Sequence, residues 1–514
     1  MRGSARKGVV AAAALLSACT VGPDYQRPDA PVPAQYKEAG WKVGEPLDAI
    51  DRGVWWSVYQ DLLLDDLEKQ IDISNQNLKA AQAAFQQAEA IVAQARAGFF
   101  PTASVNASAQ RSRSATGAAV AGTGIGGVIS NQFSTSTSAS WVPDLWGKIR
   151  RTVESNVASA QASAGDLASA RLSAQGALAS DYLQLRMADE LKRLLDSAAK
   201  YYAESLRIIR NQYQSGTADQ SAVSQAEAQL ESTQAQAIAV GVTRAQLEHA
   251  IAVLIGKPPG EFSIAATDRV IAVPVIPSGV PAALLERRPD IAAAERLMAS
   301  ANAQIGVAEA AFYPDITLSA DYGVMALKIA KLFTDQARFW AFGSTLAETV
   351  FDAGARRAVV AQTIAAFDQA IANYRQTVLT AFQQVEDQLA AIRYLSAQVA
   401  QLRRAVADQR QAVDVFLNQF RAGTTAFTTV VVAEVQLLAD EEAELTARQN
   451  LFLASVNLIV ALGGGWDIAL LPTQGQLQRD FSLLPQLESQ PSPVGTIPSD
   501  ILVPPPLAPP PGAQ

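Results

Sequence analysis

Cysteine and histidine are almost absent from this chain of 514 residues, which contains one of each. A disulfide framework within the chain is therefore excluded, and a Cys/His metal site is close to excluded. Charged residues amount to 18% of the chain and the net charge is −8, which argues against nucleic acid as a partner. No run of about 18 uninterrupted apolar residues follows the N-terminus, so we expect no helix to span a membrane.

Catalytic motifs are also missing from the sequence. No nucleophile–base set, phosphate-binding loop or carboxylate pair stands out, so we predict that the protein is not an enzyme and uses no cofactor. Ala, Gln, Ser and Leu dominate the chain instead. This composition favours long helices.

The N-terminus has the pattern of a secretory signal. Basic residues precede an apolar run at 9–16 that ends in Leu16-Ser17-Ala18-Cys19, so residues 1–18 are predicted to be a signal peptide. The last four residues resemble the lipobox of bacterial lipoproteins. The resemblance implies cleavage after Ala18, a diacylglycerol on the Cys19 sulfur and an acyl chain on its amine; an ordinary signal peptide with an incidental cysteine is the alternative. Residues 19–60 are expected to form an extended segment over the surface.

The rest of the chain is a duplication. Landmark residues recur at an offset of 207, the difference between Gly216 and Gly423, without an intervening gap. The matched pairs are Gly147 and Gly354, Arg150 and Arg357, Tyr213 and Phe420, Gly216 and Gly423, and Gly256 and Gly463. Phe99-Phe100-Pro101 matches Phe312-Tyr313-Pro314 at an offset of 213, so the stretch between the two strands of a copy should hold a length difference.

Each copy has the same predicted order of elements. Period-two alternation indicates strands, and long Pro-free runs with 4-3 apolar spacing indicate coiled-coil helices. Repeat 1 covers 61–260, with a helix, strands at about 101–114 and 131–142, a long helix at 147–213 and a return helix at 217–255. Repeat 2 covers 281–466, with a helix at 290–311, strands at about 315–324 and 338–350, a long helix at 354–420 and a return helix at 424–462. A linker at 261–280 joins the repeats, and 467–514 is a C-terminal segment with a disordered Pro-rich tail.

These elements predict a mainly α fold with a small β part. Strands of about ten residues can cross a bilayer when they are tilted, but open sheet edges do not survive in lipid. Four strands are too few to close a barrel, so several chains must share one. Three chains give twelve strands and a cylinder of twelve helical rods, although the residues alone do not fix the number three.

Several tracts together resemble the outer-membrane efflux lipoproteins of the TolC superfamily, NodT/OprM branch. They are the lipobox, Trp55-Trp56, the Phe-Phe-Pro turn, 143–147, the two Gly-Thr tips and 284–290 (Leu-Leu-Glu-Arg-Arg-Pro-Asp). The resemblance implies a homotrimeric channel anchored in the bacterial outer membrane, with a 12-strand transmembrane β-barrel above a long α-barrel in the periplasm. It implies a passive duct for drugs or other small molecules, served by a periplasmic adaptor (a membrane fusion protein) and an inner-membrane pump of the RND class.

The resemblance also places the working residues at the ends of the helical hairpins. Ser215, Gly216, Thr217, Ala422, Gly423 and Thr424 match the tips that the adaptor grips. A closed state at rest needs contacts near these tips, and the candidates for this periplasmic gate are Tyr213, Asp219, Asp414 and Arg421. The family often carries Asp two residues after the second tip glycine, where this chain has Thr425, so Asp219 is a candidate to replace it.

Two other functions stay open at this point. One is a type I secretion exit duct for polypeptides, which the lipobox argues against. The other is a coiled-coil structural lipoprotein without a pore, which the two strand pairs argue against.

Overall fold

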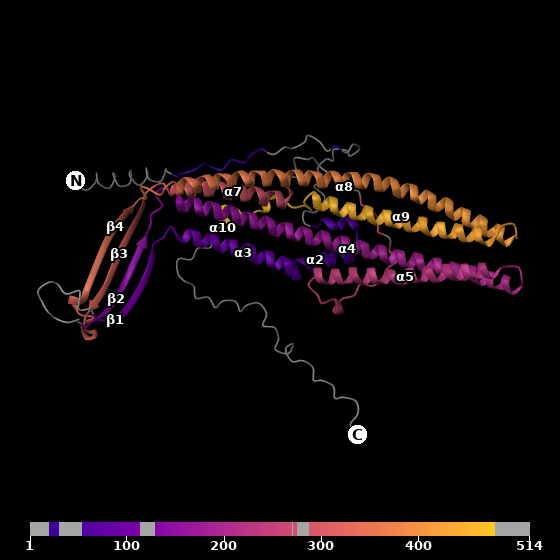
Figure 1. The fold of residues 1–514 in the computed structure, drawn as a ribbon, viewed down its shortest axis with the longest axis horizontal. Coiled ribbons are helices and arrows are strands. Elements are labelled where there is room, and N and C mark those ends of the chain that lie inside the picture. The colour runs from indigo at the N-terminus through magenta and orange to yellow at the C-terminus, as the bar shows by residue number, and fades with distance from the viewer. Residues whose placement is uncertain are drawn as a thin grey trace, which may run out of the picture.

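The computed structural model describes residues 20–29, 37, 54–113, 129–269, 271–274 and 287–477. The chain forms a long rod of helices with a small sheet at one end (Figure 1). Four sequence predictions lie outside the described residues: the signal peptide, the lipidated Cys19, most of the loop between the first two strands, and the Pro-rich tail.

Four helices account for most of the rod. They are α4 (Lys148–Gln214), α5 (Gln220–Leu254), α8 (Ala355–Arg421) and α9 (Phe427–Ala461). The long helices α4 and α8 have 67 residues each, and the return helices α5 and α9 have 35 residues each. At 1.5 Å per residue the long helices extend roughly 100 Å. The ends of α4 and α8 are 207 residues apart, and so are the ends of α5 and α9, so the duplication extends to whole helices.

Shorter helices complete each rod. They are α2 (Leu62–Ser74) and α3 (Gln76–Ala97) in the first repeat and α7 (Pro289–Ala310) in the second. The sequence predicted a single helix before the first strand pair, and this was wrong, because the helix is divided at Asn75. Its side chain accepts the Leu78 amide at 2.9 Å and donates to the Leu254 carbonyl at 2.7 Å. These bonds cap α3 and tie the break to the end of α5.

One antiparallel sheet carries the strands of both repeats in the order β1-β2-β3-β4. The strands are β1 (Thr102–Arg113), β2 (Ile129–Trp141), β3 (Asp315–Ala326) and β4 (Arg338–Ala347). The pairing of β2 with β3 joins the two repeats, with Ala139 opposite Ala320. Both outer strands, β1 and β4, keep one edge unpaired within the chain.

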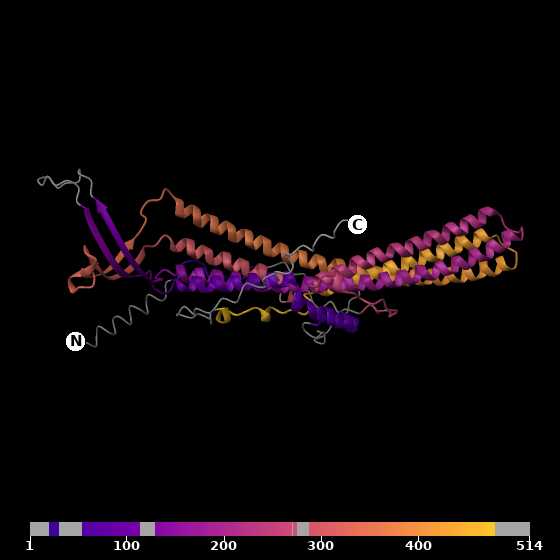
Figure 2. The same cartoon turned by 90° about the horizontal axis from the view of Figure 1, so that it is seen from below.

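Below the sheet, the helices form a layer whose order changes along the rod. Near the sheet, α4 lies between α3 and α7, and α7 contacts α8. Toward the far end, α4 lies between α5 and α9, and α9 pairs with α8 (Figures 1 and 2). The two hairpins α4–α5 and α8–α9 end side by side at that far end (Figure 1). Each of the two sequence repeats therefore contributes two rods to the layer along its whole length.

The remaining regular elements in the described part of the chain are short. They are 3₁₀ turns at Trp55–Tyr59, Pro259–Glu261, Ile329–Lys331, Asp335–Ala337 and Ile468–Leu470, and the one-turn helix α10 (Gln474–Leu477). Two of these lie between β3 and β4, in the loop that the sequence expected to differ in length between the copies.

The N-terminal segment is only partly the extended surface segment that the sequence predicted. Residues 20–29 have no regular structure and lie along α4 and α7, where Arg151 donates to the Gly22 carbonyl at 3.0 Å and to Asp24 at 2.9 Å. Trp55 and Trp56, however, are 1% and 3% exposed and belong to the largest hydrophobic core. The surface prediction was wrong for this pair because burying two indole rings removes a large apolar area from water.

A second tether lies in the tract 284–290, of which residues 287–290 are described. Arg288 is buried beside the end of α9, where it donates to the Ala461 carbonyl at 2.9 Å and to Gln384 at 2.9 Å. Asp290 accepts from the same guanidinium. Arg288 therefore fixes the start of α7 against both helices of the second hairpin.

Candidate functional site: the helical tips

The two hairpin ends are built alike by their glycines. Gly216 and Gly423 both have φ of +75°, a conformation that glycine adopts without strain. The Gly216 amide donates to the Tyr213 carbonyl at 2.9 Å and the Thr217 amide donates to the Gln212 carbonyl at 2.8 Å. The second tip repeats both bonds at 2.9 Å. These bonds form the Schellman motif, which satisfies the last carbonyls of each long helix and turns the chain back.

Threonine adds one further bond at each tip. The hydroxyl of Thr217 donates to the Gln212 carbonyl and that of Thr424 donates to the Gln419 carbonyl, both at 3.0 Å. The tips differ one residue before the glycine. Ser215 contacts the Gln212 carbonyl and the Thr217 hydroxyl, whereas Ala422 has no hydroxyl. The first tip therefore presents a more polar turn than the second.

Both tips are open to solvent. The six tip residues named from the sequence are all exposed. A Cβ placed on Gly216 or Gly423 meets no atom within 4 Å, so it is the backbone conformation, and not crowding, that requires glycine there. An exposed turn of fixed conformation at the end of a rigid rod is suited to contact with another protein.

A small hydrophobic cluster holds the two tips together. Its buried members come from both hairpins: Leu206, Ile209, Val223, Ala226, Phe427, Val430 and Val431. The rings of Phe420 and Phe427 pack with their centroids 5.3 Å apart. The two tips are thus fixed relative to each other within one chain.

No hydrogen bond or ion pair joins the four gate candidates to one another within one chain. Tyr213 is 46% exposed, and Asp219, Asp414 and Arg421 are exposed as well. Asp219 precedes α5 as its N-cap residue, but its side chain makes no cap hydrogen bond. The pKa of Glu204 lies below its usual range because Arg207 donates to it, and Arg421 adds a weaker attraction. Arg421 of α8 is therefore close to α4.

Sequence reasoning missed a row of ion pairs along α9, one to α4 of the other hairpin and two to α8 of its own hairpin. Glu190 of α4 pairs with Arg448 of α9 at 2.7 Å. On the neighbouring face, Arg403 pairs with Glu444 at 3.0 Å and Arg410 pairs with Glu441 at 2.5 Å. The signal was the helical spacing of Glu441, Glu444 and Arg448, which places their side chains on adjoining parts of α9.

A cavity of about 590 Å³ lies beside this row between α4, α8 and α9. Asp414 lines it together with Glu434. Burial raises the pKa of Glu434 to about 7, although a hydrogen bond from Ser205 at 3.4 Å opposes the shift. Asp414 thus faces a partly apolar space between the hairpins, and none of the other three gate candidates lines this cavity.

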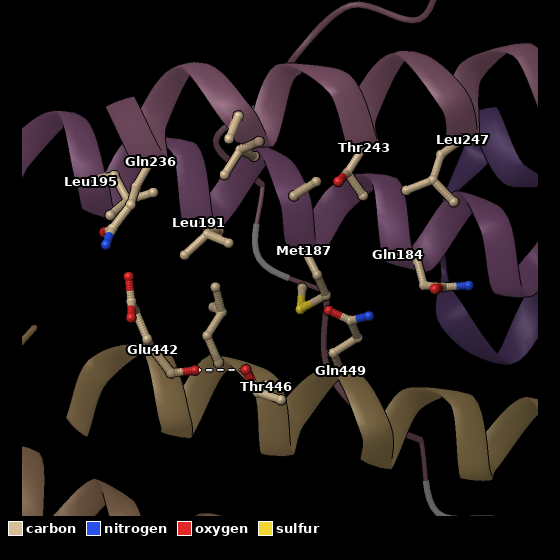
Figure 3. A pocket seen from close by; sticks show the side chains of 14 residues that line it. Gln184, Met187, Leu191, Leu195, Gln236, Thr243, Leu247, Glu442, Thr446 and Gln449 are labelled. Atoms are coloured by element: carbon tan, nitrogen blue, oxygen red, sulfur yellow. Dashed lines mark hydrogen bonds between the residues drawn. The ribbon is translucent and has the colours of Figure 1, made fainter. Parts of the chain in front are cut away.

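A second hollow of about 420 Å³ lies between α4, α5 and α9 (Figure 3). Met187 of α4 and Gln449 of α9 project into it from opposite sides (Figure 3). Within the described residues, no group of three or more His, Cys, Asp or Glu side chains could hold a metal ion. Both hollows are junctions between helices of the two hairpins.

Comparison with known proteins identifies the architecture. The sequence profile described as "Outer membrane efflux protein" matches residues 67–257 and 280–464, which covers both repeats. The chain belongs to this family. Membership in this family assigns the protein to the outer membrane and gives it a function in efflux.

Relatives support the same assignment over nearly the whole chain. The probable efflux pump outer membrane protein TtgC of Pseudomonas putida is 29% identical over 88% of this chain and 94% of its own length. The pyoverdine export outer membrane protein OpmQ of Pseudomonas aeruginosa is also 29% identical, over 89% of this chain and 96% of its own.

Solved structures have the same fold. The outer-membrane channel OprN has a TM-score of 0.79 and 30% identity, and the match covers 87% of this chain and all of that one. The open state of the MtrE outer membrane channel of Neisseria gonorrhoeae has a TM-score of 0.76 and 25% identity, over 87% of this chain and 98% of that one.

Proposed function

We propose that this efflux protein is a homotrimeric channel that exports small molecules. The observation that carries the proposal is the pair of open edges on each copy. Strands β1 and β4 each keep one unpaired edge, which cannot face lipid. Three copies of a four-stranded sheet supply twelve strands, enough for a closed barrel, and the helical layers beneath them close in the same way.

The tips are proposed to dock a periplasmic adaptor, which links the channel to an inner-membrane pump of the RND class. Three features support this role. The tips lie at the far end of the rod from the sheet (Figure 1), their six residues are exposed, and their backbone is fixed by the same hydrogen bonds in both hairpins. A rigid, repeated surface of this kind favours docking because little conformational entropy is lost on binding.

Cys19 is proposed to carry a diacylglycerol and an N-acyl chain. The next residue, Thr20, lies at the junction of the sheet with the helices, since a Cβ on Gly147 would come within 2.8 Å of its Cγ2 atom. The Val21 amide donates to the Trp146 carbonyl at 3.2 Å and fixes the segment there. Acyl chains attached one residue earlier would start at the level where the sheet enters the membrane, and several chains together give a stable anchor.

Tyr213, Asp219, Asp414 and Arg421 are proposed to close the channel at the tips through contacts between copies. Their exposure in one copy supports this, because side chains that act across a boundary between copies have no partner within one. Opening is then a shift of packed helices toward a second arrangement.

Ion conductance of the purified full-length protein in planar bilayers tests the channel. We expect a species with the mass of three chains by light scattering, and discrete conductance steps. Complementation of an efflux-deficient strain, with adaptor and pump supplied, tests the small-molecule role. A trimer that conducts no ions would support the structural lipoprotein without a pore. Secretion of a polypeptide without any efflux would support the type I duct.

A further inference from the structure

The cavity between α4, α8 and α9 is bounded by one face of each helix. Its lining residues recur every three or four positions along α4, at 190, 193–194, 197–198 and 201–202, so they share one side of that helix. The walls from α8 and α9 follow the same spacing within 410–417 and 434–441. The volume of about 590 Å³ lies in the range of sites that hold a drug-sized molecule. The cavity therefore has room for a small organic ligand.

Apolar and aromatic side chains form much of the cavity, and part of it is open to solvent. Tyr202 and Leu438 line it and are 4% and 7% exposed, whereas Tyr201 lines it and is 71% exposed. Leu194 and Leu417 add half-buried walls from α4 and α8. A ligand that enters from solvent can therefore bury an apolar body among these side chains.

The charges in the cavity are not balanced within the described part of one chain. Six charged residues line it: Glu190, Arg193, Arg410, Asp414, Glu434 and Glu441. Both arginines are paired with carboxylates, at 2.6 and 2.5 Å. Glu190 and Glu441 are paired with arginines as well. Asp414 and Glu434 form no ion pair with any described residue, so the cavity presents an excess of negative charge.

Glu434 is the more buried of these two carboxylates. Its Oε1 atom accepts from the Ser205 hydroxyl at 3.4 Å, while its Oε2 atom is buried without a hydrogen-bond partner among the described residues. A buried charge without a partner costs free energy, and a cation beside it offsets that cost through an attraction that low polarity strengthens. The carboxylate thus favours a positively charged ligand.

We propose that this cavity binds a bulky organic monocation, with its charge beside Glu434 and its apolar body against Tyr201 and Leu417. A compact inorganic cation gains nothing from the apolar walls and loses more hydration on entry. The tyrosine rings add attraction to a cation that lies over their faces. The site goes beyond the export duct proposed above, because it lies between the two hairpins of one chain. Its binding test needs no conductance, so a failed channel test would leave it standing.

Tetraphenylphosphonium tests the site, because it is a bulky cation that carries no titratable proton. Its matched control is tetraphenylborate, an anion with the same four phenyl groups. Isothermal titration calorimetry of the full-length protein, with the protein-free detergent subtracted, should give saturable binding of the cation and none of the anion. Equal binding of both ions, or no saturable binding of the cation, would overturn the proposal.

Glu434→Gln tests the charge. The variant keeps the size of the side chain and removes the carboxylate, so the affinity for tetraphenylphosphonium should fall by about tenfold or more at alkaline pH. Glu442→Gln is the matched control, because Glu442 lies on the same helix but lines the other hollow. An unchanged affinity in Glu434→Gln, or an equal loss in both variants, would contradict the role of Glu434.

Val413→Trp tests the cavity without altering a charge. Val413 is half-buried and lines the cavity from α8, so an indole there occupies the space proposed for the ligand. Binding of tetraphenylphosphonium should be lost while the helical content by circular dichroism is unchanged. A folded variant that binds the cation as the parent does would place the cation elsewhere and overturn the site.

The pH dependence of binding separates a charged site from a merely apolar one. The charged and titratable groups that face Glu434 line the same cavity: Glu190, Arg193, Tyr201 and Tyr202 from α4, Arg410 and Asp414 from α8, and Glu441 from α9. Burial raises the pKa of Glu434 to about 7, and the cation favours its ionised form. The affinity should therefore fall by about tenfold from about pH 8 to about pH 6 in the parent, and not in Glu434→Gln. An affinity independent of pH in the parent would contradict the proposal.

Discussion

The Glu68 carboxyl group shows how strongly burial can shift the pKa of a single side chain. Glu68 of α2 is 0% exposed, and neither of its carboxylate oxygens has a hydrogen-bond partner among the residues described. Burial raises its pKa to about 9, and the nearby Asp72 and Asp65 add to the shift. The carboxyl group is therefore protonated in the folded protein at neutral pH, although it ionises in the unfolded chain.

This gives a pH-dependent prediction for Glu68→Met. The folded pKa lies above the unfolded one, so the proton contributes stability below about pH 4.5 that is lost progressively as pH rises toward about 9. The variant removes this loss and should raise the free energy of unfolding by a few kcal/mol at about pH 7. Thermal unfolding followed by circular dichroism at acidic and alkaline pH measures it. Glu68→Gln should gain less, since its amide also lacks a partner, and a larger gain at acidic pH would contradict the argument.

The gate candidates give a second prediction at the residue scale. Tyr213 and Arg421 are exposed and near the tips, so replacing both by Ala should weaken contacts between copies without removing any buried group. We expect single-channel conductance in planar bilayers to increase, with thermal stability unchanged. Tyr201→Ala is the control, because this tyrosine of α4 is 71% exposed and lies farther from the tip. An unchanged closed state would rule out a gate role for the pair.

At the scale of elements, the two hairpins share their lengths and their end motif but not their surroundings. Both long helices have 67 residues, and both end in a Schellman turn on a glycine. Yet α4 lies inside the layer and buries many side chains, whereas α8 lies at its edge and buries few. Equivalent positions therefore carry different residues. Glu190 of α4 pairs with Arg448 of α9 in the same chain, whereas its equivalent on α8, Ala397, is exposed at the edge of the layer.

The tips provide the prediction for this scale. Asn tolerates a positive φ, and a side chain on Gly216 or Gly423 meets no atom within 4 Å. Gly216→Asn with Gly423→Asn should therefore leave the fold intact and add bulk where the adaptor is proposed to dock. We expect drug susceptibility of the complemented strain to rise while the amount of protein in the outer membrane stays constant. Gly260→Asn, at an open glycine far from the tips, is the control, and full resistance in the tip variant would argue against docking there.

At the scale of the molecule, a single chain leaves sheet edges unpaired and apolar helix faces exposed. Its sheet has two open edges, and its helical layer ends in α5 and α8 with apolar side chains in solvent. The N-terminal segment runs from the junction of sheet and helices along the rod (Figure 1). Tyr25 donates to Glu295 at 2.5 Å and Arg27 donates to Tyr374 at 3.0 Å. This segment ties the proposed membrane anchor to α7 and α8.

The anchor gives the final prediction. Cys19→Ser removes the proposed acylation site but none of the contacts of residues 20–29. We expect mass spectrometry of the mature N-terminus to show acyl chains in the parent and none in the variant, with the helical content unchanged. Ser17→Ala leaves the cysteine in place and serves as the control. An unacylated N-terminus in the parent would show that the segment is an ordinary signal peptide.

Local patterns in the sequence were enough to predict the elements of this protein and the equivalence of its two repeats. Its 4-3 apolar spacing, its glycines at matched positions and its alternating runs placed the bounded helices, the strands and the tips within three residues, because these depend on local periodicity and backbone conformation. The contacts that each helix face makes became known only from the folded structure. The break at Asn75, the burial of Trp55 and Trp56, and the ion pair of Glu190 with Arg448 all join segments far apart in the chain. Such contacts cannot be predicted from the periodicity of a short stretch of sequence, because they depend on how distant segments pack together.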